Sequence, residues 1–202
     1  MARTGEHLIL ASSSPTRRRL LADAGLEVRV EPARVDEEAI RGRFQAAGGS
    51  AADCALALAE AKARQVAANR HDALVIGADQ ILVCDGDWLD KPLSLADARV
   101  QLLFLRGRTH ELLTAACVVR QQAMMWQAVT SARLTVRNFS DTFLNAYLGA
   151  EGSAILGSVG SYRLEGRGIQ LFARIEGDYF AILGLPLLEL LSFLRERRAL
   201  SS

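Results

Sequence analysis

The chain has 202 residues, of which 50% are apolar and 23% are charged, and its formal net charge is +1. This length suits one domain or two small lobes that share a cleft, with enough apolar side chains for a core without metal or disulfide support. Proteins that follow a nucleic-acid backbone usually carry a clear basic surplus, so the near-neutral charge argues against nucleic-acid polymers as partners. Small anionic ligands, which a few well-placed cations can hold, are not excluded.

The three cysteines, Cys54, Cys84 and Cys117, are widely spaced, and each lies in an apolar stretch. Because they form no CxxC pair, we expect buried reduced thiols and no zinc site. No apolar run approaches the roughly 20 residues that cross a membrane, and the run at 8–11 is too short for the core of a signal peptide. The sequence therefore predicts a soluble, cytoplasmic protein that does not bind membranes.

The first half of the chain is expected to alternate between strands and helices. Residues 7–12 form an apolar run typical of a short buried strand. Ser14 is placed to cap the next helix, with Pro15 at its first position and Gly25 just beyond its end. Next we expect a strand at 26–30, an acidic polar stretch at 36–38, a helix at 51–68, and a strand at 73–80 that stays extended to residue 83.

The second half is expected to contain longer strands and a glycine-rich interruption. Ser94 and Asp97 resemble a capping box that opens a helix ending near Gly107. The other elements are a turn at 85–87, strands at 112–119, 126–139, 170–175 and 179–183, a helix from 140 to about 148, a glycine-rich segment at 157–168 and a C-terminal helix at 186–197. This order predicts an α/β protein with a mixed central sheet, flanking helices and a cleft.

Residues 11–19 place small hydroxyl side chains and arginines at the start of a helix. The backbone N–H groups, the helix dipole and the hydroxyls of Ser12 and Ser14 favour an anion there. Arg17 adds a forked, permanently charged donor that suits phosphate oxygens. The plainer alternative is a capped surface helix with solvated arginines, and these residues alone do not decide between the two.

Asp79 is a carboxylate at the end of an otherwise apolar strand. Ligands of open α/β sheets gather at the carboxyl ends of strands, where a carboxylate can hold a metal, although a turn-capping Asp is the alternative. Glu37 could be a second metal ligand or a base, but acidic runs in loops are usually only solvated. Taken alone, Lys62 in the alanine-rich helix and Lys91 before Pro92 would each be assigned to the surface.

The three histidines, His7, His71 and His110, show no metal-ligand spacing, and no Ser-His-Asp triad is indicated. What remains is a set of separate cations and carboxylates that we expect to converge at a strand end. Such a set suits metal-assisted phosphoryl chemistry, in which positioning and charge neutralisation supply most of the catalysis.

Seven short motifs occur in a fixed order over almost the whole chain: Leu10–Arg18, Val35–Glu37, Leu58–Ala63, Ile76–Gln80, Asp90–Pro92, Gly160–Tyr162 and Gly184–Leu187. Together they resemble the Maf family of house-cleaning nucleotide pyrophosphatases. The resemblance implies a single domain over 1–202 with two lobes around a cleft, similar in fold to inosine-triphosphate pyrophosphatases. It also implies Mg²⁺ or Mn²⁺ as cofactor, a nucleoside triphosphate as substrate, and a homodimer as an arrangement that family members often adopt.

The resemblance also assigns site residues. The positions that match the family's catalytic set are Arg17, Glu37, Lys62, Asp79 and Lys91, while Ser12 and Ser14 would line the phosphate end. Asp79, with Glu37 as a second ligand, would hold the metal, and the three cations would neutralise the phosphate tail while water attacks the α-phosphorus. The family usually has Arg where Thr16 stands, but this departure leaves Arg17 aligned with the catalytic arginine.

The most specific expectation concerns substrate preference. Gln80, and Glu165-Gly166 preceded by Arg163, resemble the branch of the family that prefers 7-methyl-GTP over dTTP and UTP. A carboxylate such as Glu165 accepts N–H donors and favours a cationic methylated guanine. Alternatively, Glu165 merely pairs with Arg163 or Arg167.

Three other functions are kept open. The first is a dTTP/UTP pyrophosphatase, and the second is an inosine/xanthosine triphosphatase, which the order of the motifs disfavours. The third is a nucleotide-sensing regulator of septum formation and cell division, against which the near-complete catalytic set argues.

Overall fold

The computed structural model describes residues 7–197 and residue 199. Its strands are β1 (His7–Leu10), β2 (Val28–Val30), β3 (Ala73–Cys84), β4 (Asp87–Leu89), β5 (Thr109–Arg120), β6 (Ala123–Val136) and β7 (Phe172–Glu176). Its helices are α1 (Pro15–Asp23), α2 (Glu37–Ala46), α3 (Ala51–Ala67), α4 (Leu95–Leu105), α5 (Asp141–Glu151), α6 (Tyr179–Ile182) and α7 (Leu187–Glu196), with 3₁₀ turns η1 (Gly152–Gly157), η2 (Val159–Ser161) and η3 (Arg167–Leu171).

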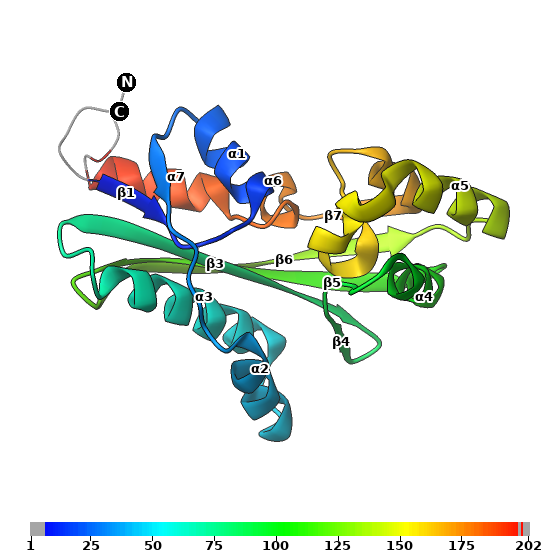
Figure 1. The fold of residues 1–202 in the computed structure, drawn as a ribbon, viewed down its shortest axis with the longest axis horizontal. Coiled ribbons are helices and arrows are strands. Elements are labelled where there is room, and N and C mark those ends of the chain that lie inside the picture. Colours follow the sequence, from blue (N-terminus) through cyan, green and yellow to red (C-terminus); the bar gives the residue numbers. More distant parts are fainter. Residues whose placement is uncertain (1–6, 198, 200–202) are drawn as a thin grey trace. The chain divides into compact units, whose positions relative to one another are not determined.

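The strands form one mixed sheet in the order β2-β1-β3-β5-β6-β7, with β4 paired to β3 (Figure 1). Strand β1 runs parallel to both β2 and β3, whereas the β3–β4 and β6–β7 pairs are antiparallel. The predicted α/β class with a mixed sheet and flanking helices is therefore confirmed.

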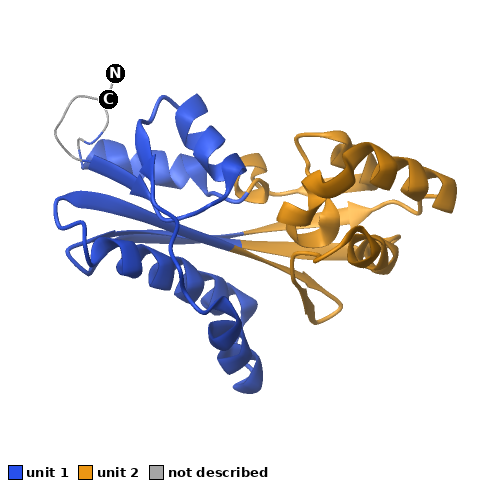
Figure 2. Ribbon diagram, in the orientation of Figure 1, with its two compact units in different colours: residues 1–79, 114–130, 184–202 blue, residues 80–113, 131–183 orange. Residues whose placement is uncertain are grey.

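The chain divides into two compact units (Figure 2). The first contains the residues up to 79, 114–130 and those from 184 onward, and the second contains 80–113 and 131–183. The divisions fall within β3, β5 and β6, so each of these strands contributes residues to both units.

In the first unit, helices cover both faces of the sheet: α3 lies on one face, and α1 and α7 on the other (Figure 1). Helix α3 packs unusually close to β3 because residue 77 is glycine. A Cβ at Gly77 would lie 2.1 Å from the carbonyl oxygen of Ala59 and 2.9 Å from Cβ of Ala63. This close approach packs the buried face of α3 against β3, whose residues up to Asp79 belong to the first unit.

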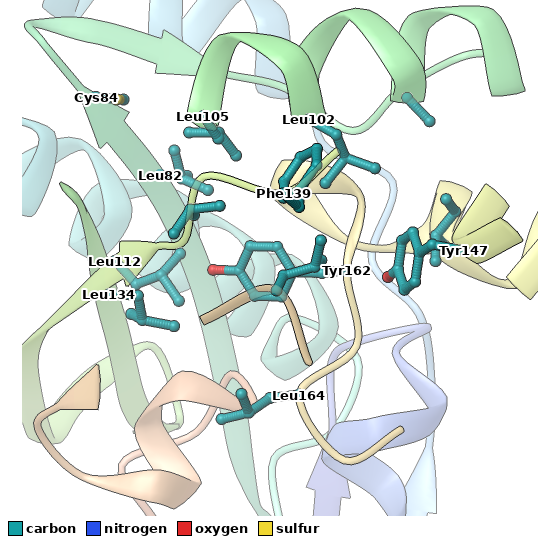
Figure 3. Close-up of a cluster of buried hydrophobic side chains, with 14 of the residues drawn as sticks. Leu82, Cys84, Leu102, Leu105, Leu112, Leu134, Phe139, Tyr147, Tyr162 and Leu164 are labelled. Carbon is teal, nitrogen blue, oxygen red and sulfur yellow. The ribbon is translucent and has the colours of Figure 1, made fainter. Parts of the chain in front are cut away.

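The second unit has an aromatic and leucine-rich core, drawn in Figure 3. Leu102 and Leu105 of α4 and Tyr147 of α5 pack in the same cluster as Tyr162 and Phe139. Each of these residues is at most 5% exposed. The unit therefore has its own apolar core to hold its 3₁₀ turns in place.

A neutral polar pair lies inside that core. His110, which is 1% exposed, lies with Nε2 2.7 Å from the hydroxyl oxygen of Tyr162, and its Nδ1 is buried without a hydrogen-bond partner in the described part of the chain. Burial lowers the pKa of His110 to about 4 and raises that of Tyr162. Phe172 packs against both rings, with centroid distances of 6.0 Å to His110 and 4.8 Å to Tyr162.

Two local predictions are wrong. The acidic stretch at 36–38 was expected to be a polar loop, but it begins α2: Asp36 caps the helix by accepting from the N–H of Ala39 at 2.9 Å. Acidic residues in a first turn are favoured by the helix dipole. Residues 179–183 were expected to be a strand but form α6, which Asp178 caps by accepting from the N–H of Ala181 at 2.7 Å.

The expectations for residues 73–83 and for the cysteines hold. Residues 73–84 form a single strand where the sequence predicted a strand with an extended continuation. The three cysteines are free and buried, and burial raises the pKa of Cys117 to about 12. No helix among the described residues is both long and apolar enough to cross a membrane.

Candidate active site

The start of α1 forms the first part of a polar cluster in the first unit. Ser14 caps the helix, and its hydroxyl accepts from the N–H of Arg17 at 3.3 Å. The buried hydroxyl of Ser12 accepts from the N–H of Ser14 at 3.2 Å and from Nη1 of Arg17 at 3.1 Å. The predicted serine-rich helix start therefore holds its arginine against the serines.

The Arg17 guanidinium is fixed on three sides. Besides Ser12, its Nη1 donates to the carbonyl oxygen of Ala78 at 2.8 Å, and its Nε donates to that of Gly184 at 2.7 Å. The Nη2 group takes no part in these bonds, so a clamped guanidinium still offers donors to an anion. Burial lowers the pKa of Arg17, while the negative charges of Asp79 and Glu37 oppose that change. An arginine keeps its charge in proteins.

Gly184 is a functional position that the sequence reasoning did not assign, although it begins one of the matched motifs. Its φ of +105° lies in a region that side chains rarely adopt, and a Cβ there would lie 3.2 Å from Nε of Arg17. Glycine therefore allows the backbone carbonyl to approach the guanidinium. The signal in the sequence was the Gly184-Leu185-Pro186 turn ahead of the C-terminal helix.

Lys62 lies between two carboxylates. Its Nζ is 2.5 Å from Oδ1 of Asp79 and 2.9 Å from Oε1 of Glu37. The Lys62 and Asp79 side chains are 9% and 10% exposed, whereas the Glu37 side chain is 52% exposed. The expectation that Lys62, taken alone, is a surface lysine is therefore wrong, because it lies on the buried face of α3.

Three helices and a strand supply this cluster. Glu37 is the first residue of α2, Lys62 follows Leu58 and Ala59 on the apolar face of α3, and Asp79 ends the part of β3 that belongs to the first unit. Arg17 comes from α1, so each of the four charged side chains is supplied by a different element. The cluster brings together two cations and two carboxylates.

The other predicted site residues, Gln80, Lys91 and Glu165, belong to the second unit. Lys91 and Glu165 are exposed, and Gln80 is half-buried. The Gln80 amide donates to the carbonyl oxygens of Ala181 and Ile182, at 3.0 and 3.1 Å.

Glu165 lies in a turn that is anchored on both sides. The N–H of Gly166 donates to the carbonyl oxygen of Arg163 at 3.1 Å, and the Leu164 side chain is buried. Nε of Arg163 is 3.2 Å from Oε2 of Glu151. Glu165 is therefore a solvent-exposed residue on a turn that these contacts hold in place.

Comparison with known proteins gives the family. A model described as Maf-like protein matches residues 7–197, and the chain belongs to the Maf family. A nucleoside triphosphate pyrophosphatase of Granulibacter bethesdensis is 52% identical over 96% of this chain and 98% of its own length. A 7-methyl-GTP pyrophosphatase of Rhizobium meliloti is 50% identical over 96% of this chain and 98% of its own length.

Among solved structures, a dITP/XTP pyrophosphatase of Mycobacterium abscessus aligns with 95% of this chain and 94% of its own. The sequence identity is 16% and the TM-score is 0.46, a likeness too low to support an argument.

Proposed function

We propose that this Maf protein is a nucleoside triphosphate pyrophosphatase, a hydrolase that uses water to split a triphosphate into a nucleoside monophosphate and pyrophosphate. The observation that carries the proposal is the cluster in which a clamped arginine and a buried lysine lie beside two carboxylates. Fixed cations are suited to a polyphosphate, because catalysis of phosphoryl transfer consists mainly of positioning and charge neutralisation.

The residues of the cluster divide the work by chemistry. Arg17 offers its Nη2 donors to the phosphate chain from a guanidinium that needs no reorganisation. Lys62 supplies a flexible point charge, and its two ion pairs use two of its three N–H donors. Water attacks the α-phosphorus, and the bond between this phosphorus and the oxygen that bridges it to the β-phosphorus breaks. These cations neutralise the negative charge of the departing pyrophosphate. Lys91 is proposed as a third cation for the phosphate tail.

The donor set fits a divalent metal that binds together with its substrate. Asp79 and Glu37 both direct a carboxylate oxygen at one point, occupied by the ammonium of Lys62. Among the described residues no group of three or more His, Cys, Asp and Glu side chains could hold a metal by itself. Mg²⁺ typically takes one or two carboxylates and completes its coordination with substrate phosphates and water. When bound, the metal would supply charge neutralisation at phosphate oxygens.

We propose 7-methyl-GTP as the preferred substrate. Three of the relatives at about 50% identity carry that activity in their names, while others are named only as nucleoside triphosphate pyrophosphatases. The exposed Glu165 can accept the N–H donors of guanine and favours a cationic base. Both N–H groups of the Gln80 amide already donate to backbone carbonyls, so the amide has no spare N–H donor for the carbonyls of uracil or thymine.

The test is pyrophosphate release by the purified chain with Mg²⁺, comparing 7-methyl-GTP, UTP and dTTP at equal concentration. Faster release from 7-methyl-GTP supports the proposed substrate. Faster release from UTP and dTTP refutes the role of Glu165 and leaves the enzyme class intact. No release from any of them, nor from inosine or xanthosine triphosphate, would contradict the enzyme itself.

A further inference from the structure

The Lys62 ammonium occupies the position at which the two proposed metal ligands converge. We infer that Lys62 keeps Asp79 and Glu37 from binding a divalent cation while the nucleotide is absent, so that the metal binds together with the triphosphate. This inference rests on the proposed function, because it takes Asp79 and Glu37 as the metal ligands.

The contacts of Lys62 support this inference. Its Nζ lies 2.5 Å from Oδ1 of Asp79 and 2.9 Å from Oε1 of Glu37, and the Lys62 and Asp79 side chains are both buried. A metal that coordinates the same oxygens would come within about 4 Å of the ammonium, where water screens the repulsion between two cations poorly. The metal and the ammonium therefore compete for the two carboxylates.

The two cations of the cluster differ in their freedom to move. Arg17 is held by one hydroxyl and two backbone carbonyls, none of which is a metal ligand. The Lys62 ammonium is held by its ion pairs with the two carboxylates, and its four-carbon stem is flexible. A triphosphate offers the ammonium new anionic partners, so Lys62 can leave the carboxylates without losing its charge compensation.

Replacement of the Lys62 ammonium by the metal can begin at Glu37. Its side chain is 52% exposed, whereas that of Asp79 is 10% exposed. Water can replace the Glu37 contact, but the buried Asp79 needs a cation beside it at every stage. Lys62 supplies that cation in the free enzyme, and the metal supplies it once the ammonium has turned to the phosphates.

The experiment measures Mn²⁺ binding to the full chain without nucleotide, by the loss of the free Mn²⁺ signal in electron paramagnetic resonance. We expect Lys62→Met to bind Mn²⁺ about tenfold more tightly than the wild type, or better. Lys62→Arg keeps the positive charge and should bind as weakly as the wild type. Arg64→Met is the matched control, because Arg64 lies on the same helix but pairs with Glu60, and it should leave Mn²⁺ binding unchanged.

Adding Asp79→Asn to Lys62→Met should remove the gained affinity. If Lys62→Met is folded but gains no affinity, or if the gain survives Asp79→Asn, the inference is wrong. Should Lys62→Met fail to melt cooperatively, Lys62→Gln replaces it. The wild type gives a test of its own: saturable Mn²⁺ binding without nucleotide that Asp79→Asn abolishes would overturn the inference. Pyrophosphate release is not part of this measurement, so a failure of the proposed activity is detected separately.

Discussion

The two units bury polar groups in opposite ways. In the first, Lys62 and Asp79 are hidden as ions in contact with each other. In the second, His110 and Tyr162 are hidden as a hydrogen-bonded pair that burial keeps neutral, with the pKa of His110 lowered to about 4. A folded core thus removes the charge of a titratable group that has no counter-ion, whereas the candidate active site retains charge by pairing it.

This difference follows from what each region has to hold. Burying an unpaired charge is costly, so a titratable group without a counter-ion is buried in its neutral form. A site for a polyphosphate and a metal needs its charges in place before the ligand arrives. The cost of holding them is reduced in the first unit by the ion pairs of Lys62 with Asp79 and Glu37, and by the attraction of these two carboxylates for the charge of Arg17. Four predictions test the contrast.

The largest effect is expected for Asp79→Asn. The substitution removes the buried charge that faces Lys62 and a proposed metal ligand, and kcat/KM for pyrophosphate release should fall by about 10³-fold. Asp23→Asn is the matched control, because Asp23 pairs with Arg19 on the surface, where both side chains are more than 60% exposed. Undiminished activity in Asp79→Asn would show that the cluster is not the active site.

The next effect is a loss of stability in acid caused by His110. Its pKa is about 4 in the folded chain and about 6.5 in an unfolded one, so the unfolded state binds the proton first as the pH falls. Stability should be complete above about pH 6.5 and should decrease toward pH 4, by up to about 3 kcal/mol. Urea unfolding across this pH range measures the slope. In His110→Phe the slope should be smaller, and an unchanged slope would assign it to other groups.

Tyr162→Phe should destabilise the chain by about 2 kcal/mol, because it leaves Nε2 of the buried His110 without its partner. Tyr179→Phe is the control, since Tyr179 is 49% exposed and should lose its hydroxyl at little cost. Urea midpoints of the two variants give the comparison. Equal stability of both variants would mean that the buried pair contributes nothing to the core.

The smallest effect concerns substrate choice. Glu165→Gln keeps the size of the side chain but adds an N–H donor, so the preference for 7-methyl-GTP over UTP should fall about tenfold with little change in stability. The ratio of the two kcat/KM values is the measurement. Glu176→Gln, on exposed strand β7, should leave that ratio unaltered. A ratio that does not change in Glu165→Gln would assign base selection to other residues.

Local patterns in the sequence were enough to predict most of the fold. Apolar runs indicated β1 and β3, and Ser14 with Pro15 gave the start of α1, because these signals depend on near neighbours in the chain. The two errors also concern local signals. Asp36 and Asp178 each cap a helix, but 36–38 was interpreted as a polar stretch and 179–183 as a strand. The single-domain organisation over 1–202 and the homodimer remain predictions.

The sequence by itself determined the family and the identities of the charged residues, because motifs in a fixed order are specific even when each is short. Only the tertiary structure decided which of those residues meet. Lys62 cannot be distinguished from a surface lysine by its sequence neighbours. It contacts Asp79 because α3 packs closely against β3 at Gly77. The carbonyl oxygens that hold Arg17 come from Ala78 and Gly184, and backbone atoms carry no side-chain signal in a sequence. Contacts across 17 to 167 residues of chain arise from packing, which local patterns do not record.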